Sequence, residues 1–481
     1  MQDHARATRL NAALAVAWTL LALWRLPTHG HFLYDEAFFW QRALAVVRSH
    51  LPAGYGPYVS GTSPMLFTPG GGAFDLLAVG QLFTSNPLAG AVWVVLLAAG
   101  GLVFFDRALA KLEVAPEARV AAMVLYAFGI WHFRMTDRIW NVDLFHFASP
   151  LLLFLAATAA TSVTAARPET WRRRCAAGVL LGMAAGLCLQ IHLSGSMAIA
   201  LAGLAVLPRL RRLPRRELLA LGAFALVGLL AAYVPYVVVD AAHGFANTHH
   251  LGGGRTNPGA FGVASGRSLA TFFQFTSQSD PFRPERFPGD LRGELGTLTF
   301  FVAIAATLAG ALRRSPLQLM ALGGLLVPPA FFAVTGRDYL AHYAVAGAPF
   351  YVLPAAVLFG GLLRSRWRAL SAVYLAFFLG LGVVDLFAEY SDDAAQWTLS
   401  DQLAIAGALS DRASEAHLVS GSLLDWQAPL YGWLAKDVLG RSLSMSGGMP
   451  CGIYDTETEA LKLGRVPVLA GRHWVVCGAS R

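Results

Sequence analysis

The chain has 481 residues, of which 56% are hydrophobic and only 14% are charged. Soluble domains carry about 25% charged residues, so this composition excludes an ordinary soluble protein and predicts a polytopic helical membrane protein. The net charge of +8 does not indicate nucleic-acid binding, because the arginines cluster in short loops between apolar runs, where they set membrane orientation.

The first apolar run covers about 10–26 and follows Arg6 and Arg9. A cleavable signal peptide has a similar pattern, but no small-x-small cleavage site follows the run, so we expect an uncleaved first span. A long outer segment comes next. In it we predict a surface helix over 35–48, which is too polar to cross, and irregular structure over the Gly- and Pro-rich stretch 52–72. A second surface helix is predicted over 73–83, which is too short to cross.

Ten further apolar runs are predicted to cross the membrane. They are about 88–105, 120–133, 144–161, 176–191, 196–207, 218–239, 295–312, 317–334, 344–363 and 370–387, which gives about 11 spans in total. With the N-terminus inside, the short inner loops hold 19 of the 37 Lys and Arg residues. This is the positive-inside pattern, and it predicts a cytoplasmic N-terminus and a C-terminus outside.

Two domains are expected. Residues 1–388 form the transmembrane domain, and 389–481 have ordinary soluble composition with short apolar stretches, which favours a small mixed α/β domain outside the cytoplasm. Cys451 and Cys477 both lie in this tail and can form a disulfide in an oxidising compartment. Two free thiols are the alternative.

The predicted topology brings polar side chains together on the outer face. They are Asp35 and Glu36 from the first outer segment, Arg138, Asn141 and Asp143 from the second, and Arg337 and His342 from the segment after the ninth span. A carboxylate can deprotonate an acceptor hydroxyl or amine, and arginines can hold a phosphate leaving group. One face with both kinds of group indicates a reaction on a charged substrate at the bilayer surface.

Two motifs on this face resemble a known family. Residues 34–40 (Tyr-Asp-Glu-Ala-Phe-Phe-Trp) follow the first span, and residues 138–143 (Arg-Ile-Trp-Asn-Val-Asp) precede an apolar run. Weaker matches are Gln-Ile-His at 190–192 and His-Tyr at 342–343. With them the chain resembles, over roughly 10–390, the C-type-fold membrane glycosyltransferases of the protein-mannosyltransferase and lipid A aminoarabinose-transferase kind.

The resemblance implies an enzyme that moves a sugar from a polyprenyl-phosphate donor to a glycolipid, polysaccharide or protein acceptor. The reaction would take place on the non-cytoplasmic face of the plasma (inner) membrane and invert the anomeric carbon. It also implies that Asp35 is the catalytic base, with Glu36 beside it and Asp143 assisting.

The chain departs from that family at two positions. Some relatives carry an Arg three residues after the first Asp, where this chain has Phe38, and an acidic-Lys pair where it has Phe67-Thr68. Those basic residues help to hold the donor phosphate. The expected substitutes are Arg42, Arg138, Arg337 or arginines of the long 240–294 loop, and Asn141 and His342 complete the predicted substrate-binding set.

Plainer interpretations stand beside these. Asp35 and Glu36 can cap a surface helix, and Asp143 can be a helix N-terminal residue without a catalytic part. The histidines show no metal-ligand spacing, so we expect no required metal or other cofactor. The alternative function is a transporter or a non-catalytic lipid-binding assembly factor. A transporter would place ionisable residues near the membrane midplane, whereas here they gather at one surface, which favours an interfacial enzyme.

Overall fold

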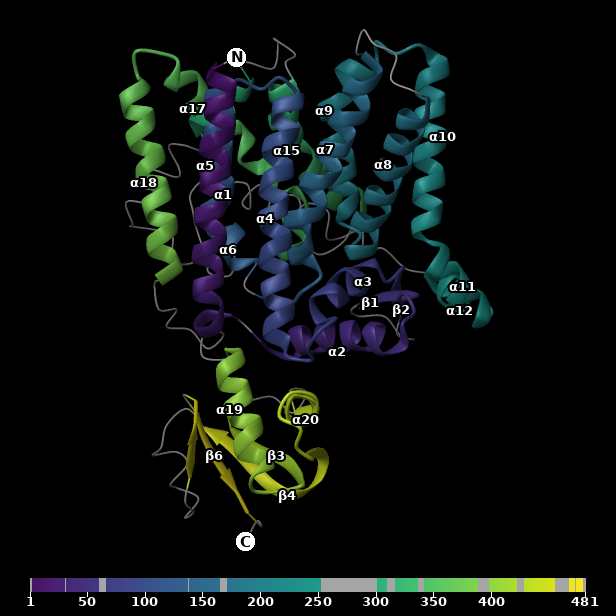
Figure 1. The fold of residues 1–481 in the computed structure, drawn as a ribbon, viewed down its shortest axis with the longest axis vertical. Coiled ribbons are helices and arrows are strands. Elements are labelled where there is room, and N and C mark those ends of the chain that lie inside the picture. Colours follow the sequence, from purple (N-terminus) through teal and green to yellow (C-terminus); the bar gives the residue numbers. More distant parts are fainter. Residues whose placement is uncertain are drawn as a thin grey trace.

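A computed structural model describes most of the chain. The described residues are 2–30, 32–59, 66–136, 138–164, 171–251, 301–308, 316–335, 341–387, 398–421, 428–454, 467–471 and 473–478. Upright helices form a bundle, a layer of shorter elements covers one end of it, and a C-terminal domain lies beyond that layer (Figure 1). The two termini therefore lie at opposite ends of the molecule.

The bundle consists of apolar helices that run roughly side by side (Figure 1). They are α1 (Gln2–His29), α4 (Pro87–Lys111), α5 (Pro116–Ala127), α7 (Phe145–Thr164), α8 (Trp171–Ile191), α9 (Gly195–Leu210), α10 (Arg215–Ala232), α15 (Pro316–Thr335), α17 (Leu353–Leu363) and α18 (Arg368–Phe387). Within the described ranges five helical stretches are long and apolar enough to cross a membrane, or six with a bent pair. This supports a multi-pass membrane protein, and the count of about 11 spans stays a prediction.

Two predicted spans are broken by local sequence. The expected helix over 120–133 ends with α5, and a short helix, α6 (Ile130–Arg134), begins after Gly129. The expected helix over 218–239 bends by 45° between α10 and α11 (Val234–Ala242). Pro235 lies in the first turn of α11, where its missing N–H is tolerated but interrupts the continuing helix.

The predicted span over 344–363 is also divided. It contains the 3-10 helix η5 (Ala341–Gly347), the single turn α16 (Ala348–Tyr351) and then α17. Pro349 and Pro354 each occupy the first turn of a new helix, because proline begins a helix more readily than it continues one. Hydropathy finds the apolar run but not these breaks.

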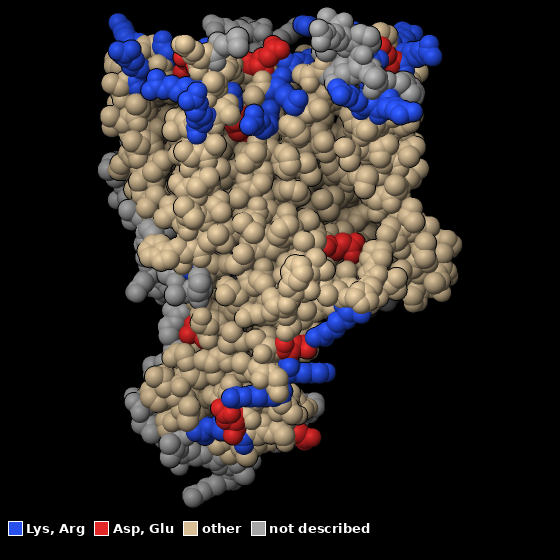
Figure 2. All heavy atoms as spheres, in the orientation of Figure 1, with Lys and Arg blue, Asp and Glu red and all other residues tan. Residues whose placement is uncertain are grey.

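Lys and Arg side chains gather at the end of the bundle that holds the N-terminus, and the middle of the visible face is nearly free of charge (Figure 2). The basic residues include Arg6 and Arg9 of α1, others in the first turns of α8 and α10, and others in the last turns of α4 and α9. This distribution matches the short basic loops from which the sequence predicts orientation.

A buried polar network ties three helices together near this basic end. Arg119 of α5 donates two hydrogen bonds to Asp106 Oδ1 of α4, at 2.7 and 3.1 Å, and one to Thr8 Oγ1 of α1 at 3.0 Å. Asn11 Nδ2 of α1 donates to the same Asp106 oxygen at 2.7 Å. Arg119 is 1% exposed and Asp106 is 5% exposed. Charges this deeply buried are tolerated because they are paired and hydrogen-bonded.

The layer at the opposite end comes from the segment between α1 and α4. It contains α2 (Tyr34–Ser49), β1 (Tyr55–Val59), β2 (Leu66–Pro69), α3 (Gly72–Ala78) and the 3-10 turn η1 (Val79–Gln81). α2 lies across the bundle end, almost at right angles to the long helices (Figure 1). Helices lie at both predicted positions, although α3 ends at Ala78, before the predicted end at residue 83. The stretch expected to be irregular contains the antiparallel β1–β2 pair, which its glycines and prolines concealed.

The C-terminal domain has the expected mixed α/β character. Its elements are α19 (Leu399–Ser410), β3 (Glu415–Gly421), α20 (Ala428–Asp437), β4 (Ser444–Tyr454), β5 (Val468–Ala470) and β6 (His473–Cys477), and the sheet order is β3-β4-β6-β5. β3 and β4 are parallel and the other pairs are antiparallel. Cys451 and Cys477 face each other across β4 and β6 and form a disulfide, which decides between the two alternatives left by the sequence.

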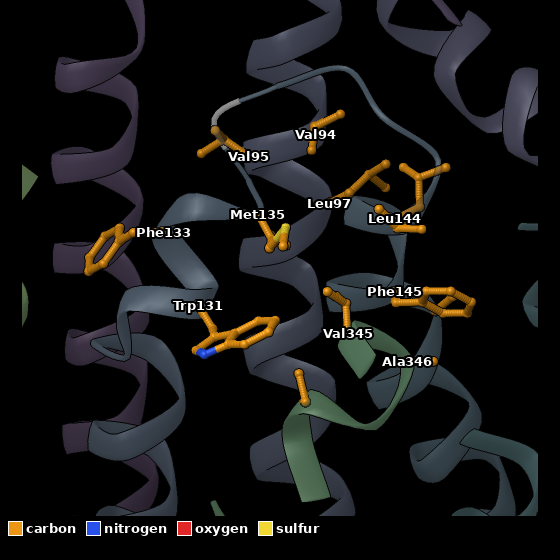
Figure 3. Close-up of a cluster of buried hydrophobic side chains, with 14 of the residues drawn as sticks. Val94, Val95, Leu97, Trp131, Phe133, Met135, Leu144, Phe145, Val345 and Ala346 are labelled. Carbon is orange, nitrogen blue, oxygen red and sulfur yellow. The ribbon is translucent and has the colours of Figure 1, made fainter. Parts of the chain in front are cut away.

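An apolar core lies between the basic end and the layer of shorter elements at the opposite end. Figure 3 shows side chains from four segments of the chain meeting there: Val94, Val95 and Leu97 of α4, Trp131, Phe133 and Met135 around α6, Leu144 and Phe145 at the start of α7, and Val345 and Ala346 of η5. Met135 and Leu144 lie at the two ends of the second outer segment, and both are buried. That stretch is therefore anchored in the core at both ends.

Candidate active site

α2 carries the predicted base, and its residues divide among three faces. Successive residues of an α-helix are about 100° apart around its axis. We name the faces buried, docking and pocket faces according to what each contacts. The buried face holds Glu36, Trp40 and Ala43, and the docking face holds Gln41 and Arg48. Arg42 and Ser49 line a pocket and define the pocket face, and the helix period places Asp35 and Phe38 on the same side of the axis.

Glu36 fixes the start of α2. Its Oε2 accepts a hydrogen bond from the backbone N–H of Leu33 at 3.0 Å, which is the reciprocal half of a capping box. Its Oε1 lies 3.7 Å from Nη1 of Arg138. Glu36 is only 2% exposed, so this carboxylate holds the helix start against the second outer segment. The capping interpretation therefore applies to Glu36.

Asp35 lies one residue earlier and on a different face. It is half-buried, and a rotation of about 100° separates it from Glu36. Asp35 shares the pocket face with Arg42, seven residues or about two turns further along α2. Of the two adjacent carboxylates, Asp35 is the more accessible to a substrate.

The second outer segment, which contains Arg138, Asn141 and Asp143, contacts both α2 and α8. Arg138 contacts Glu36, and its guanidinium carbon lies 5.5 Å from the ring centre of Trp140. Asn141 Nδ2 donates to the carbonyl of Ile191, the last residue of α8, at 2.7 Å. Asp143 lies in the 3-10 turn η2 (Val142–Leu144) directly before α7 and is 1% exposed. This is also the position of an ordinary helix-start carboxylate, so the geometry leaves both interpretations of Asp143 open.

The end of α8 meets the beginning of η5. The ring of His192 stacks on Tyr343 with the centroids 4.2 Å apart, and His192 Nδ1 lies 3.0 Å from Ser194 Oγ. His342 precedes Tyr343 in the first turn of η5, but its side chain is outside the described part of the structure, and Arg337 is outside it altogether. The weak sequence matches at 190–192 and 342–343 thus adjoin each other in space.

Three consecutive glycines let the first outer segment approach α8. Gly70 has a φ of +86°, and a Cβ there would lie 2.5 Å from the Gln190 side chain. The backbone N–H of Gly72 donates to Gln190 Oε1 at 2.8 Å, while Gln190 Nε2 donates to the Ala232 carbonyl at 2.7 Å. Only glycine fits this close approach. The sequence predicts irregular structure here, but it does not indicate that Gln190 is the partner of these glycines.

A pocket opens beside the second half of α2. Its volume is about 310 Å³, and it is lined by Arg42, Ala45, Val46, Ser49, Leu51, Pro52, Ala53, Gly54, Tyr55, Gly56, Phe67 and Phe74. Among the described residues that line it, Arg42 is the one charged residue. Its guanidinium carbon lies 5.3 Å from the ring centre of Phe38. The volume is at the low end for ligand sites, and the largely apolar wall with one cation is typical of them.

The walls of this pocket are fixed by hydrogen bonds. Ala53 N–H donates to Asp75 Oδ1 of α3 at 2.7 Å. Burial raises the pKa of Asp75, and this hydrogen bond opposes the rise. Tyr55 O–H donates to Asp240 Oδ1 of α11 at 3.0 Å. Partial burial raises the pKa of Tyr55, and the bond to the Asp240 carboxylate raises it further, to about 12.

Asp240 joins the pocket wall to the bundle edge. It is fully buried and also accepts hydrogen bonds from Tyr236 O–H and from the backbone N–H groups of Asn247 and Thr248, each at 3.1 Å. Those two residues belong to α12 (Ala246–Leu251). Asn247 in turn bonds both the N–H and the C=O of Phe67. In the sequence Asp240 is only the first residue of a predicted loop, and no local pattern indicates this role.

Metal ligands do not cluster in the described residues: no group of three or more His, Cys, Asp or Glu side chains there is placed to hold an ion. The expectation of no required metal stays a prediction.

No protein-family model matches the chain, and no match in sequence to a curated protein is found. Solved structures do match in fold. ArnT from Cupriavidus metallidurans in the apo state superposes with a TM-score of 0.57 over 98% of both chains, at 14% identity. The chain has the fold of ArnT. The same protein bound to undecaprenyl phosphate gives a TM-score of 0.55 over 98% of both chains, at 13% identity.

This similarity confirms, at the level of the fold, the resemblance seen in the sequence, because ArnT is an aminoarabinose transferase with the C-type glycosyltransferase fold. The similarity extends over the ArnT-like C-terminal domain as well as the helices, since almost the whole of each chain is covered. The roles of individual residues are not part of what a fold similarity establishes.

Proposed function

We propose that the protein is an integral-membrane glycosyltransferase that takes a sugar from a polyprenyl-phosphate donor. The observation that carries the proposal is the match of the entire chain, helices and C-terminal domain together, to the fold of ArnT, which has been solved with undecaprenyl phosphate bound. The outer polar cluster supports it, because a carboxylate and arginines lie together at one end of an apolar bundle. This arrangement suits a charged lipid substrate at the bilayer surface.

In the proposed reaction an acceptor hydroxyl or amine attacks the anomeric carbon of the donor sugar. A new bond forms from the acceptor to that carbon, and the carbon–oxygen bond to the polyprenyl phosphate breaks on the opposite face. The phosphate leaves with the bonding electrons, and the proton of the acceptor passes to Asp35. A direct displacement of this kind inverts the anomeric configuration.

The other residues have supporting roles in this proposal. Arg138 lies beside the start of α2 and offers charge to the departing phosphate, whereas Arg42 lines the pocket that we assign to the acceptor. Asn141 holds the second segment against α8, and Asp143 assists from the start of α7. Because phosphate is already a good leaving group, positioning and charge stabilisation supply most of the rate enhancement. Arg337 and His342 remain candidates for substrate binding.

The acceptor is a glycolipid, polysaccharide or protein that presents its nucleophile from the outer face. The pocket beside Arg42 is the best place for it, because it adjoins the face of α2 that carries Asp35. Arg42 and Asp35 are about 10 Å apart along the helix axis, which leaves room for a sugar between the two side chains.

The test is transfer from radiolabelled polyprenyl-phosphate sugars in membranes that contain the wild type, Asp35→Asn or Asp411→Asn. Asp411 is an exposed carboxylate of the C-terminal domain and serves as the control. Loss of a general base lowers the rate by about 10² to 10⁴-fold, so we expect Asp35→Asn to fold but to transfer at or below 1% of the wild-type rate. Equal rates for all three proteins would remove Asp35 from the mechanism. Absence of transfer from every donor would favour the transporter or assembly-factor alternative.

A further inference from the structure

The C-terminal domain contacts α2 through Asp437, at the end of α20. Its carboxylate bridges two positions of the docking face: Oδ1 accepts from Arg48 Nη2 at 2.7 Å and Oδ2 from Gln41 Nε2 at 3.0 Å. Gln41 and Arg48 are seven residues apart, so a single side chain spans about two turns of the helix. The Asp437 side chain is only 8% exposed, although Arg48 itself is largely exposed.

The backbone of Asp437 provides a second connection. Its carbonyl accepts a hydrogen bond from Ser85 Oγ, and the carbonyl of Ser85 accepts one from Trp40 Nε1 at 2.9 Å. Trp40 is fully buried on the face of α2 that packs against the bundle. Asp437 therefore reaches α2 both directly, on the docking face, and through Ser85 to the buried face.

These contacts act on the helix that carries Asp35. α2 lies across the end of the bundle, and α20 lies directly below it (Figure 1). The pocket face, with Asp35 and Arg42, is turned about 100° from the docking face. A contact at two turns of the docking face fixes both the rotation of α2 about its axis and its position along the bundle end.

We propose that Asp437 is a positioning residue: the C-terminal domain sets the orientation of α2, and thereby of Asp35, through Asp437. The inference rests on the proposed transferase function for its kinetic part but not for its structural part. The carboxylate suits this role because it is held in place by the domain and makes a charge-assisted bond to Arg48, which is stronger than a neutral one.

The experiment compares Asp437→Ala with Asp411→Ala in the full-length protein. Asp411 pairs with Arg441 at 2.7 Å inside the same domain, with both side chains well exposed, so it controls for loss of a carboxylate without contact to α2. Hydrogen exchange of the α2 amides gives a readout that needs no substrate. We expect exchange to rise on the order of tenfold in Asp437→Ala and to stay at the wild-type rate in Asp411→Ala.

The kinetic readout separates positioning from folding. A small misplacement of a catalytic group lowers the rate of the chemical step by up to about 10²-fold. Asp437→Ala should therefore lower kcat about tenfold or more, with KM for the donor changed less than about twofold. The reversed pair Arg48→Asp with Asp437→Arg should recover kcat and exchange protection, whereas each of these changes alone should not.

The outcomes distinguish this inference from the proposed function. Faster α2 exchange without transfer activity in any protein would uphold the contact and reject the transferase. Unchanged exchange in Asp437→Ala would overturn the positioning role, whatever the activity. A fall in kcat without recovery in the reversed pair would also overturn it, because the effect would then not pass through Arg48.

Discussion

The two ends of the bundle hold their charges in different ways. At the basic end Arg119, Asp106 and Asn11 are joined by hydrogen bonds of 2.7 to 3.1 Å and are almost wholly buried. At the outer end Glu36 and Arg138 lie 3.7 Å apart, and the Arg138 side chain is 11% exposed. The first arrangement is closed and serves stability. The second is looser and leaves its arginine within reach of a substrate.

The largest effect should come from breaking the closed network. Arg119→Met leaves the Asp106 carboxylate buried without its charge partner, which costs about 3 to 5 kcal/mol. We therefore expect a much lower midpoint of thermal unfolding in detergent, or no folded protein at all. The double variant Arg119→Met with Asp106→Leu should recover most of the loss, because a buried pair can be replaced by apolar residues at little cost.

Arg174 provides the control for that experiment. It pairs with Glu217 at 3.1 Å near the same end, but both side chains are partly exposed, and such pairs contribute about 0 to 1 kcal/mol. If Arg174→Met were as destabilising as Arg119→Met, burial would not be the reason for the importance of the network.

The second effect concerns the outer end, where a covalent bond takes the place of a buried network. Replacing Cys451 and Cys477 by Ala opens a loop with a sequence separation of 26, and a loop of this length corresponds to about 3 kcal/mol. We expect the C-terminal domain to become sensitive to protease while the helix bundle keeps its unfolding midpoint. Cys175, a free thiol, is the control. Equal sensitivity of Cys175→Ala would show that the disulfide is not the cause.

The third effect is catalytic rather than structural. Arg138→Met should destabilise the protein less than Arg119→Met, because the Arg138–Glu36 pair is 3.7 Å apart, beyond hydrogen-bond distance, whereas Arg119 donates two hydrogen bonds to Asp106. Removing a group that stabilises developing charge typically lowers kcat about 10² to 10³-fold. We expect a loss of transfer in that range, with partial recovery in Arg138→Lys, which keeps the charge but not the planar donor geometry. A destabilisation as large as that of Arg119→Met, with normal transfer by the folded fraction, would assign Arg138 to structure instead.

The sequence predicts the long apolar helices better than the points at which they break. Hydropathy predicted the positions of α4, α7, α8, α9 and α18 closely, because an apolar run of about 20 residues is itself the sequence signal of a membrane-spanning helix. It missed the bend at Pro235 and the divisions at Pro349 and Pro354, where a local backbone constraint interrupts an apolar run.

For the candidate site the sequence proposes residues but does not give their pairings. A polar pair beside a span identified Asp35 and Glu36, yet nothing in the sequence separated their roles. The helix period separates the two roles only when the structure shows that Glu36 lies on the buried face of α2. Asp437 contacts Gln41 and Arg48, which are 396 and 389 positions away in the sequence. A local sequence pattern cannot predict contacts between residues so far apart.

The smallest expected effect tests the wall of the pocket. Tyr55→Phe removes one hydrogen bond to Asp240, which corresponds to about 1 kcal/mol of unfolding free energy, since Tyr236 and two backbone N–H groups still bond that carboxylate. The raised pKa of Tyr55, about 12, makes the effect depend on pH. A group whose pKa is higher in the folded than in the unfolded state contributes stability below its unfolded pKa, about 10 for tyrosine, and loses it as the pH rises toward 12.

The wild type and Tyr55→Phe should therefore differ in unfolding midpoint at pH 8 and converge between pH 10 and 12. Tyr454→Phe, which removes a hydroxyl from the C-terminal domain, controls for the general effect of alkali. If the difference in unfolding midpoint stayed constant across this range, the pKa of Tyr55 would not be raised by its contact with Asp240. Tyr55 also lines the pocket beside Arg42. The same variant should therefore leave Asp35 in place and alter KM for the acceptor more than kcat. This result would separate the role of the pocket wall from that of Asp35.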